Sequence, residues 1–235
     1  MRSFARLNLL LLVAVRAAAQ EPADAPPGKP EYAAVRAELL AILESDQKPR
    51  QELEELRRTH PGQSVEMREL SRKMREADVT NLPKLEAILA QHGWLGPDEV
   101  GSTASGAFFL VIQHSDLPTQ QKYLPVMREA VKAGKARGAS LALLEDRIEL
   151  RLGRPQIYGS QLRSDGGGPY YLQAIIDPDR VDERRAAVGL GPLAEYLKNW
   201  DLTWDVAAYK AKLPELMAKL SLSMQRPAPK PSEPR

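Results

Sequence analysis

The side chains best suited to acid–base chemistry occur at two places along the chain. His114 closes the apolar run 101–113, while Asp146 and Arg147 lie in a later run of helical periodicity. A histidine at the end of a helix is favoured in its charged form by the helix dipole, and its charge changes near neutral pH. Asp146 offers a carboxylate base beside the anion-binding guanidinium of Arg147. These three residues are our candidates for catalysis; a capping histidine and an inter-helix salt bridge are the structural alternatives.

A second group of polar side chains could bind a ligand. Gln156, Tyr158, Ser160 and Gln161 supply amide and hydroxyl groups within six residues. If this run is a strand, the side chains of 156, 158 and 160 point to the same face. Such a row could hold a polar small molecule, a glycan or a peptide. The alternative is a buried polar network that specifies the fold.

Two elements have to position these residues. Residues 101–114 begin with small side chains and continue with Phe108, Phe109 and Ile112, so the run is apolar on every side. A helix of this kind is normally buried. The runs 156–163 and 170–176 flank an Asp-Gly-rich turn and predict a β-hairpin. We therefore expect a predominantly helical α+β fold, with helices packed around a central buried helix (about 101–114) and one hairpin (about 156–176).

The rest of the folded part is predicted to be helical. Pro49 should break or kink the first helix, and Asn81 with Pro83 should open a new one that ends before Gly93. Asp116 is a suitable N-cap for the helix that follows the central one, and it is near enough in sequence to orient the ring of His114. The predicted helices cover residues 31–58, 64–78, 81–92, 117–133, 140–152, 179–187, 192–199 and 206–220.

Several short runs carry a family resemblance. They are residues 92–94 (HGW), 113–116 (QHSD), 120–121 (QQ), 146–147 (DR), 153–161 (GRPQIYGSQ), 182–185 (DERR) and 189–190 (GL). Through them the chain resembles, over most of its folded part, a bacterial family classified as a domain of unknown function (family 6624). The most specific run is 156–161, in which Ser160 stands where the family pattern most often has threonine and keeps the hydroxyl. The resemblance implies residues to test and no reaction.

The ends of the chain differ from its middle. Arg2 and Arg6 precede a short apolar run, and three alanines end at Ala19, which is the pattern of a secretory signal peptide. Residues 20–30 form a Pro-rich linker, and 223–235 form a Pro-rich tail that we expect to be disordered. The prediction is a signal peptide (1–19), a linker, a single globular domain (31–222) and a tail. After cleavage near Ala19 the product would be exported, periplasmic or extracellular, with no stable membrane span.

Composition excludes several classes of function. The chain has no cysteine and only three histidines, so we expect no disulfide, no metal site and no cofactor. Its net charge is +2, and it becomes −1 without residues 1–19, which hold three arginines and no acid. No excess of one sign points to nucleic acid as a partner. Neither a phosphate-binding loop nor a Gly-x-Ser-x-Gly elbow is present.

Two hypotheses from different classes remain. In the first, the chain is an exported hydrolase or transferase that handles a polar ligand in a cleft between the end of the central helix and the hairpin. His114, Asp146 and Arg147 would catalyse, and the run 156–161 would bind. In the second, the same run serves a non-catalytic binding or structural module associated with the envelope.

Overall fold

A computed structural model describes residues 28–60, 64–165 and 168–225. The chain groups into two compact units. Among the described residues, unit 1 comprises those between 28 and 144 with those between 164 and 169, and unit 2 comprises 145–163 with 170–225. The predicted signal peptide, most of the linker and the tail beyond residue 225 lie outside the described residues. The single domain expected over 31–222 stays a prediction.

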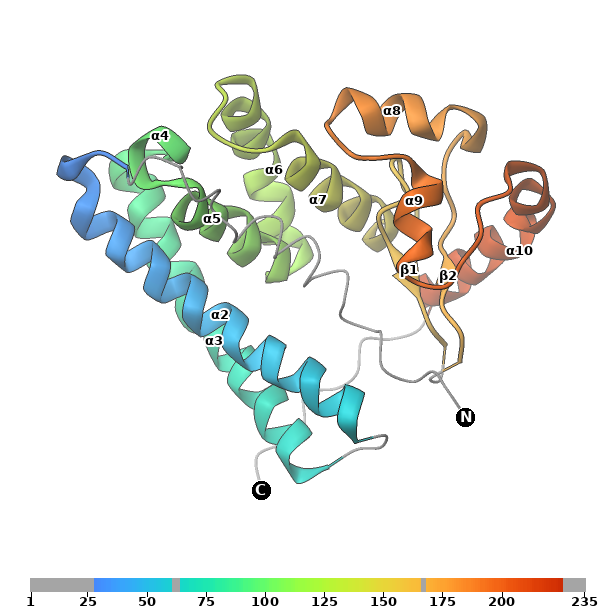
Figure 1. The fold of residues 1–235 in the computed structure, drawn as a ribbon, viewed down its shortest axis with the longest axis horizontal. Coiled ribbons are helices and arrows are strands. Elements are labelled where there is room, and N and C mark those ends of the chain that lie inside the picture. Colours follow the sequence, from blue (N-terminus) through green and yellow to red (C-terminus); the bar gives the residue numbers. More distant parts are fainter. Residues whose placement is uncertain (1–27, 61–63, 166–167, 226–235) are drawn as a thin grey trace. The chain divides into compact units, whose positions relative to one another are not determined.

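Unit 1 consists of helices (Figure 1). In chain order they are η1 (Pro30–Tyr32), α2 (Ala33–Thr59), α3 (Val65–His92), α4 (Pro97–Val100), α5 (Ser102–His114), α6 (Leu117–Lys132) and the first half of α7 (Gly138–Arg151). The long helices α2 and α3 pack side by side (Figure 1). Ser64 caps α3 by accepting a hydrogen bond from the Met67 N–H, and Gly93 ends it with φ of +68°. Asp116 caps α6 through the Thr119 N–H, as the sequence predicted.

Helix α5 is the buried centre of unit 1. It contacts α2, α3, α4 and α6. Phe108 and Ile112 are 0% exposed, as is Ala107, whose small side chain allows close packing. The predicted central helix is thereby confirmed. At 13 residues it is short, and no helix in the described part of the chain is long and apolar enough to span a bilayer.

Both long helices continue through a proline. Helix α2 runs through Pro49. Helix α3 runs through Pro83 and covers the two separate helices that the sequence predicted at 64–78 and 81–92. A proline inside a helix removes one N–H donor and strains the preceding turn. Burial on either side of Pro83, at Asn81 and Leu85, holds α3 in one piece. The prediction of a break there was wrong because packing against α2 and α5 outweighs the local preference.

Unit 2 combines the end of α7 (Gly138–Arg151) with smaller elements. They are β1 (Leu162–Arg163), β2 (Tyr171–Leu172), η2 (Pro178–Arg180), α8 (Val181–Ala187), α9 (Leu193–Lys198) and α10 (Val206–Gln225). The core of unit 2 brings Leu172, Ile175, Val181, Leu193 and Leu216 together. These residues come from the hairpin, α8, α9 and α10, so unit 2 has an apolar core of its own.

The predicted hairpin is present but short. β1 and β2 pair antiparallel, with Leu162 opposite Leu172. Residues 157–161 are not a strand, and Gln156 forms only an isolated bridge to Ile175. Gly159 has φ of +71°, which ends any extended run. The prediction that 156, 158 and 160 share one face of a strand was therefore wrong, and these residues belong to a loop.

Candidate functional site

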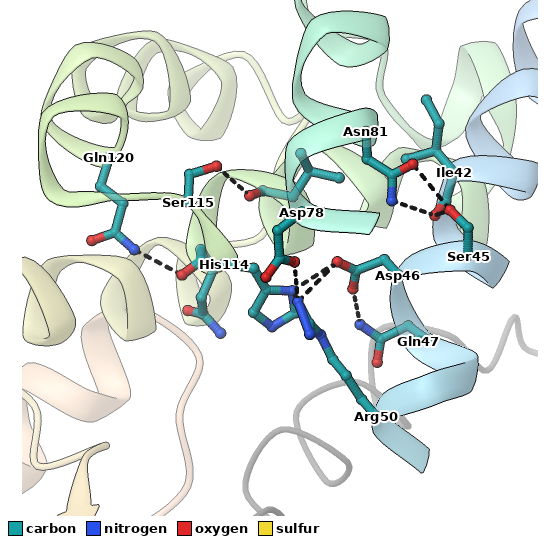
Figure 2. A network of polar contacts seen from close by, with 12 residues as sticks. Ile42, Ser45, Asp46, Gln47, Arg50, Asp78, Asn81, His114, Ser115 and Gln120 are labelled. Carbon is teal, nitrogen blue, oxygen red and sulfur yellow. Dashed lines mark hydrogen bonds and ion pairs between the residues drawn. The ribbon is translucent and has the colours of Figure 1, made fainter. Parts of the chain in front are cut away.

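A cluster of buried polar side chains lies where three helices of unit 1 meet (Figure 2). Helix α2 supplies Asp46, Gln47 and Arg50, α3 supplies Asp78, and α5 ends in His114. The spacing of Asp46 and Arg50, one helical turn apart, puts both on the same face of α2. We call these five residues the 46–114 cluster.

The centre of the cluster is a pair formed by Asp46 and His114. Asp46 Oδ1 lies 2.9 Å from His114 Nδ1, and the Asp46 side chain is 1% exposed. Arg50 Nε lies 3.2 Å from the same ring nitrogen. Nδ1 can donate to Asp46 or accept from Arg50 Nε, but it cannot do both. We assign its proton to the bond with Asp46, because that contact is the shorter one and a bare Nδ1 would face a carboxylate oxygen. This tautomer leaves Nε2 as the nitrogen that can take up a proton, and Nε2 is buried in the described structure, so a substrate reaches it only when the cluster opens.

Arg50 connects the two carboxylates of the cluster. Its Nη2 lies 3.3 Å from Asp46 Oδ1 and also donates to Asp78 Oδ1. The side chains of Arg50 and His114 are each 7% exposed, whereas that of Asp78 is 28% exposed. Asp78 is therefore the member of the cluster with the most solvent contact.

The two carboxylates differ in acidity. Burial on its own would raise the pKa of Asp46, but His114 and Arg50, with the hydrogen bonds from His114 and Gln47, hold that pKa below its ordinary value. Burial raises the pKa of Asp78, and the charge of Asp46 adds to the rise, against the opposing effect of Arg50. Two carboxylates whose pKa values are pushed apart are typical of sites in which each has its own role.

The backbone of α2 is locally modified beside the cluster. Pro49 has no N–H to donate to the carbonyl of Ser45. The Ser45 hydroxyl donates to the Ile42 carbonyl (2.9 Å) and lies 3.0 Å from Asn81 Oδ1, while Asn81 Nδ2 donates to the same carbonyl of Ile42 (3.3 Å). These bonds tie α2 to α3 one turn away from Asp46 (Figure 2). A groove of ≈ 600 Å³ between α2 and α3 includes Ser45 and Asn81 in its lining.

The cluster also has donor atoms that suit a cation. Asp46, Asp78 and His114 each offer one ligand atom, and these atoms lie within 4.8 Å of one another. Carboxylate and imidazole together suit several divalent metals. Arg50, however, already bridges both carboxylates and supplies the compensating positive charge. We therefore interpret the cluster as balanced by a cation of the chain itself.

The candidates in unit 2 surround one loop. Asp146 Oδ1 accepts from the backbone N–H groups of Ile157 (2.6 Å) and Tyr158 (2.9 Å), and its Oδ2 accepts from that of Ser160 (2.8 Å). Burial raises the pKa of Asp146, and these hydrogen bonds oppose the rise. In an extended strand the N–H groups of consecutive residues point in opposite directions, so Ile157 and Tyr158 could not both donate to one oxygen. Their shared acceptor, Asp146 Oδ1, therefore goes with a turn at this point of the chain. These contacts favour an anchoring role for Asp146.

The amide of Gln156 holds the loop from the other side. Gln156 is 0% exposed, and its Nε2 donates to the carbonyls of Gln161 (3.1 Å) and Gln173 (3.0 Å). Its Oε1 accepts from the Gln161 N–H (2.8 Å), and Gln161 Nε2 donates to the Ser160 hydroxyl (3.0 Å). Gln156 therefore fits the structural alternative, while Gln161 is only half-buried.

Tyr158 is the remaining ligand-binding candidate. Its hydroxyl donates to Glu145 Oε2 (3.1 Å), and its carbonyl accepts from Arg185 Nη1 (2.8 Å). Arg185 is 2% exposed and lies over the Tyr196 ring at 5.1 Å. Arg147 follows Asp146 on α7 and is half-buried. The structure thus gathers five of the sequence candidates at α7 and one loop of unit 2, and places Arg147 next to Asp146 on α7.

His114 has a different partner from the one that the sequence suggested. It is paired with Asp46, whereas Asp116 accepts the Thr119 N–H at the start of α6. Asp46, Arg50 and Asp78 were not among the residues predicted from the sequence. A signal for these three residues exists in the helical spacing of α2 and α3, where they interrupt apolar stripes.

The fold and the cluster define a predominantly helical α+β protein with a buried Asp–His pair. The chain belongs to a family of unknown function, DUF6624, whose model matches residues 33–212. That match includes the 46–114 cluster and the loop 156–161, and it confirms the resemblance found in the sequence. No curated protein and no solved structure matches the chain.

Proposed function

We propose that the chain is an enzyme of the hydrolase or transferase type that acts on a polar substrate, with His114 as its general base. The observation that supports this is the buried hydrogen bond between Asp46 and His114 Nδ1. A carboxylate that fixes one ring nitrogen and stabilises the imidazolium leaves the other nitrogen for proton transfer. Asp46 is then a positioning residue, and Arg50 and Asp78 hold it in place.

The proposed step is a proton transfer coupled to nucleophilic attack. His114 Nε2 takes a proton from a water molecule or a hydroxyl group. The oxygen of that water or hydroxyl group forms a bond to the electrophilic atom of the substrate at the same time. The bond to the leaving group breaks, and the imidazolium returns the proton to that group. Such a base contributes about 10²–10⁴-fold to the rate of the reactions it serves.

A test that needs no substrate is carbethoxylation by diethyl pyrocarbonate, followed by mass spectrometry. The reagent modifies neutral, reachable imidazole nitrogen. Because His114 Nε2 is buried in the described structure, its reaction in the folded chain requires local opening of the cluster; we expect it to be slower than the reaction of His60 and to stop at low pH. His60 is exposed and serves as the internal standard. Reaction of His60 without any reaction of His114 would mean that Nε2 is closed to reagents, and it would overturn the proposal in favour of a structural network.

A second test compares hydrolysis of p-nitrophenyl acetate, p-nitrophenyl phosphate and bis(p-nitrophenyl) phosphate. Any turnover should fall about 10²-fold or more in His114→Gln and stay unchanged in His60→Gln. Turnover that survives His114→Gln would contradict the assignment of the base.

We also propose that the protein is exported and cut after Ala19, so that its ligand is a small molecule, glycan or peptide met outside the cytoplasm. The basic start, the short apolar run and the alanines at 17–19 support this. Intact-mass measurement on protein from the native cell should show a chain that begins at Gln20. A mature chain that begins at Met1 would refute export by this route.

A further inference from the structure

Unit 2 contains a small pocket with an aromatic wall. It has a volume of ≈ 220 Å³, and it lies between the hairpin, the segment after α9 and the first half of α10. Its chemical character comes from Tyr170, Tyr171, Trp204 and Tyr209, with Asp205 and Lys212 at the rim. No residue of the 46–114 cluster belongs to the pocket, so its occupant can be identified whether or not the proposed function holds.

The aromatic wall is held in place by contacts of its own. The Tyr209 hydroxyl donates to the Gln173 carbonyl (2.7 Å) and accepts from the Ile175 N–H (2.9 Å). The Trp204 ring lies 5.0 Å from the Tyr209 ring. Tyr209 is 8% exposed, whereas Trp204 and Tyr171 are half-buried, and Lys219 Nζ lies 4.7 Å from the Tyr171 ring centroid. The pocket is therefore preformed, which lowers the entropic cost of filling it.

We propose that this pocket binds the Pro-rich segment 226–235 (RPAPKPSEPR) of the same chain. Grooves lined by aromatic side chains recognise Pro-rich segments, because these favour the polyproline II conformation and lose little entropy on binding. The segment has prolines at 227, 229, 231 and 234. The segment carries both basic and acidic side chains, and the rim of the pocket does too, with Asp205 and Lys212.

The segment is long enough to reach the pocket. It follows Gln225, the last residue of α10, and Lys212 at the rim precedes Gln225 by thirteen residues of the same helix. At about 1.5 Å per residue this is about 20 Å along the helix. Ten residues of polyproline II span about 31 Å, so the segment can turn back along α10 and enter the pocket.

Attachment to α10 compensates for weak contacts. A short tether gives an effective concentration in the range of about 1 mM. A segment with an intrinsic Kd near that value would occupy the pocket in about half of the molecules, and a tighter one in most of them. Docking of this strength would leave the segment bound in some molecules and unbound in others, and Trp204 would be more open to solvent where the segment is unbound.

Tryptophan fluorescence reports this directly. Trp94 and Trp200 are 7% and 5% exposed, so Trp204 should dominate quenching by acrylamide. We compare the full chain with a full-length variant in which Pro227, Pro229, Pro231 and Pro234 are all replaced by alanine. The expected result is a clear rise in the quenching constant of the variant, at unchanged circular dichroism and Tm. Trp204→Phe should abolish the difference and serves as the control.

The synthetic peptide RPAPKPSEPR identifies the occupant. Added to the alanine variant, the peptide should restore protection of Trp204 from acrylamide, and half of this effect should be reached at about 1 mM peptide. Equal quenching of the full chain and the variant would overturn the proposal. Protection that grows with protein concentration would assign the pocket to the segment of a second copy. Protection by N-acetylchitotriose and not by the peptide would assign it to a sugar.

Discussion

Replacing Asp46 by asparagine separates the charge of the buried pair from its shape. Asparagine has nearly the volume of aspartate and keeps one oxygen acceptor. It cannot carry the negative charge that faces His114 at 2.9 Å and Arg50 at 3.3 Å. Because Asp46 is 1% exposed, water cannot replace the lost interaction.

The expected size of the effect is set by these contacts. Removing one partner of a fully buried ion pair costs about 3–5 kcal/mol. Arg50 keeps its contact with Asp78, which is 28% exposed, so the remaining guanidinium is not left without a counter-charge. We therefore expect Asp46→Asn to lower the free energy of unfolding at pH 7 by about 2–3 kcal/mol.

The pH dependence of this loss is fixed in sign. The pKa of Asp46 is lowered in the folded chain, so its ionisation stabilises the fold at pH values above the unfolded pKa of about 3.9. This contribution is lost as the pH falls through the folded pKa. The difference in the free energy of unfolding between the unmodified chain and Asp46→Asn should be largest near pH 7 and should shrink below about pH 4.

Urea unfolding followed by circular dichroism at pH 7 and at about pH 2 measures both quantities. Asp179→Asn is a matched control, because Asp179 pairs with Lys210 and is 54% exposed, and it should cost less than about 0.5 kcal/mol. A loss for Asp46→Asn no larger than that of the control, or a loss that stays constant with pH, would refute the Asp46–His114 pair as a charged interaction.

Three further predictions concern stability. Asp146→Asn should cost about 2–5 kcal/mol, since its amide group would face backbone N–H donors now bound by the carboxylate; a nearly neutral urea melt would show that Asp146 does not anchor the loop. Ala107→Leu, at a position that is 0% exposed, should cost about 1–3 kcal/mol by overpacking, whereas Lys198→Leu on the surface should change little; equal losses would contradict the central placement of α5. EDTA should leave the Tm unchanged if Arg50 balances the cluster, and a fall of several degrees would reveal a bound cation.

The sequence was informative where local signals and packing agree. The run around Phe108 is apolar on all sides, and only a buried helix satisfies it, so α5 could be predicted together with its central place. Asp116 before Leu117 and Gly93 after His92 fixed two helix ends, because each residue meets a local backbone requirement. The hairpin could be predicted from two β-prone runs around a turn.

The sequence misled where a distant residue decides the backbone. Residues 156–161 have strand-forming side chains, yet three of their N–H groups turn toward Asp146, ten or more residues earlier. No local pattern shows that a carboxylate will collect these donors. The same holds for Pro83, whose helix is kept whole by its neighbours in the fold.

The missed members of the cluster do have a signal, and it lies in the seam between the two long helices. In α3 the positions 67, 70, 74, 78, 81, 85 and 88 keep a three-and-four spacing, and in α2 the positions 39, 42, 46, 50 and 53 do the same. Most of these positions carry apolar residues. Asp46, Arg50, Asp78 and Asn81 interrupt both stripes near the middle, so charged groups occupy positions that face the core.

Two explanations account for charged residues in such a seam. One is that they fix the register of α2 against α3, as single polar residues do in coiled coils. The other is that they serve a reaction, at some expense of stability, because buried ion pairs are often weaker than apolar packing of the same volume. Register alone needs complementary groups on α2 and α3, which Arg50–Asp78 and Ser45–Asn81 supply. It does not need a third helix to end in a histidine whose Nδ1 lies 2.9 Å from Asp46. The presence of His114 on α5 therefore favours the functional explanation.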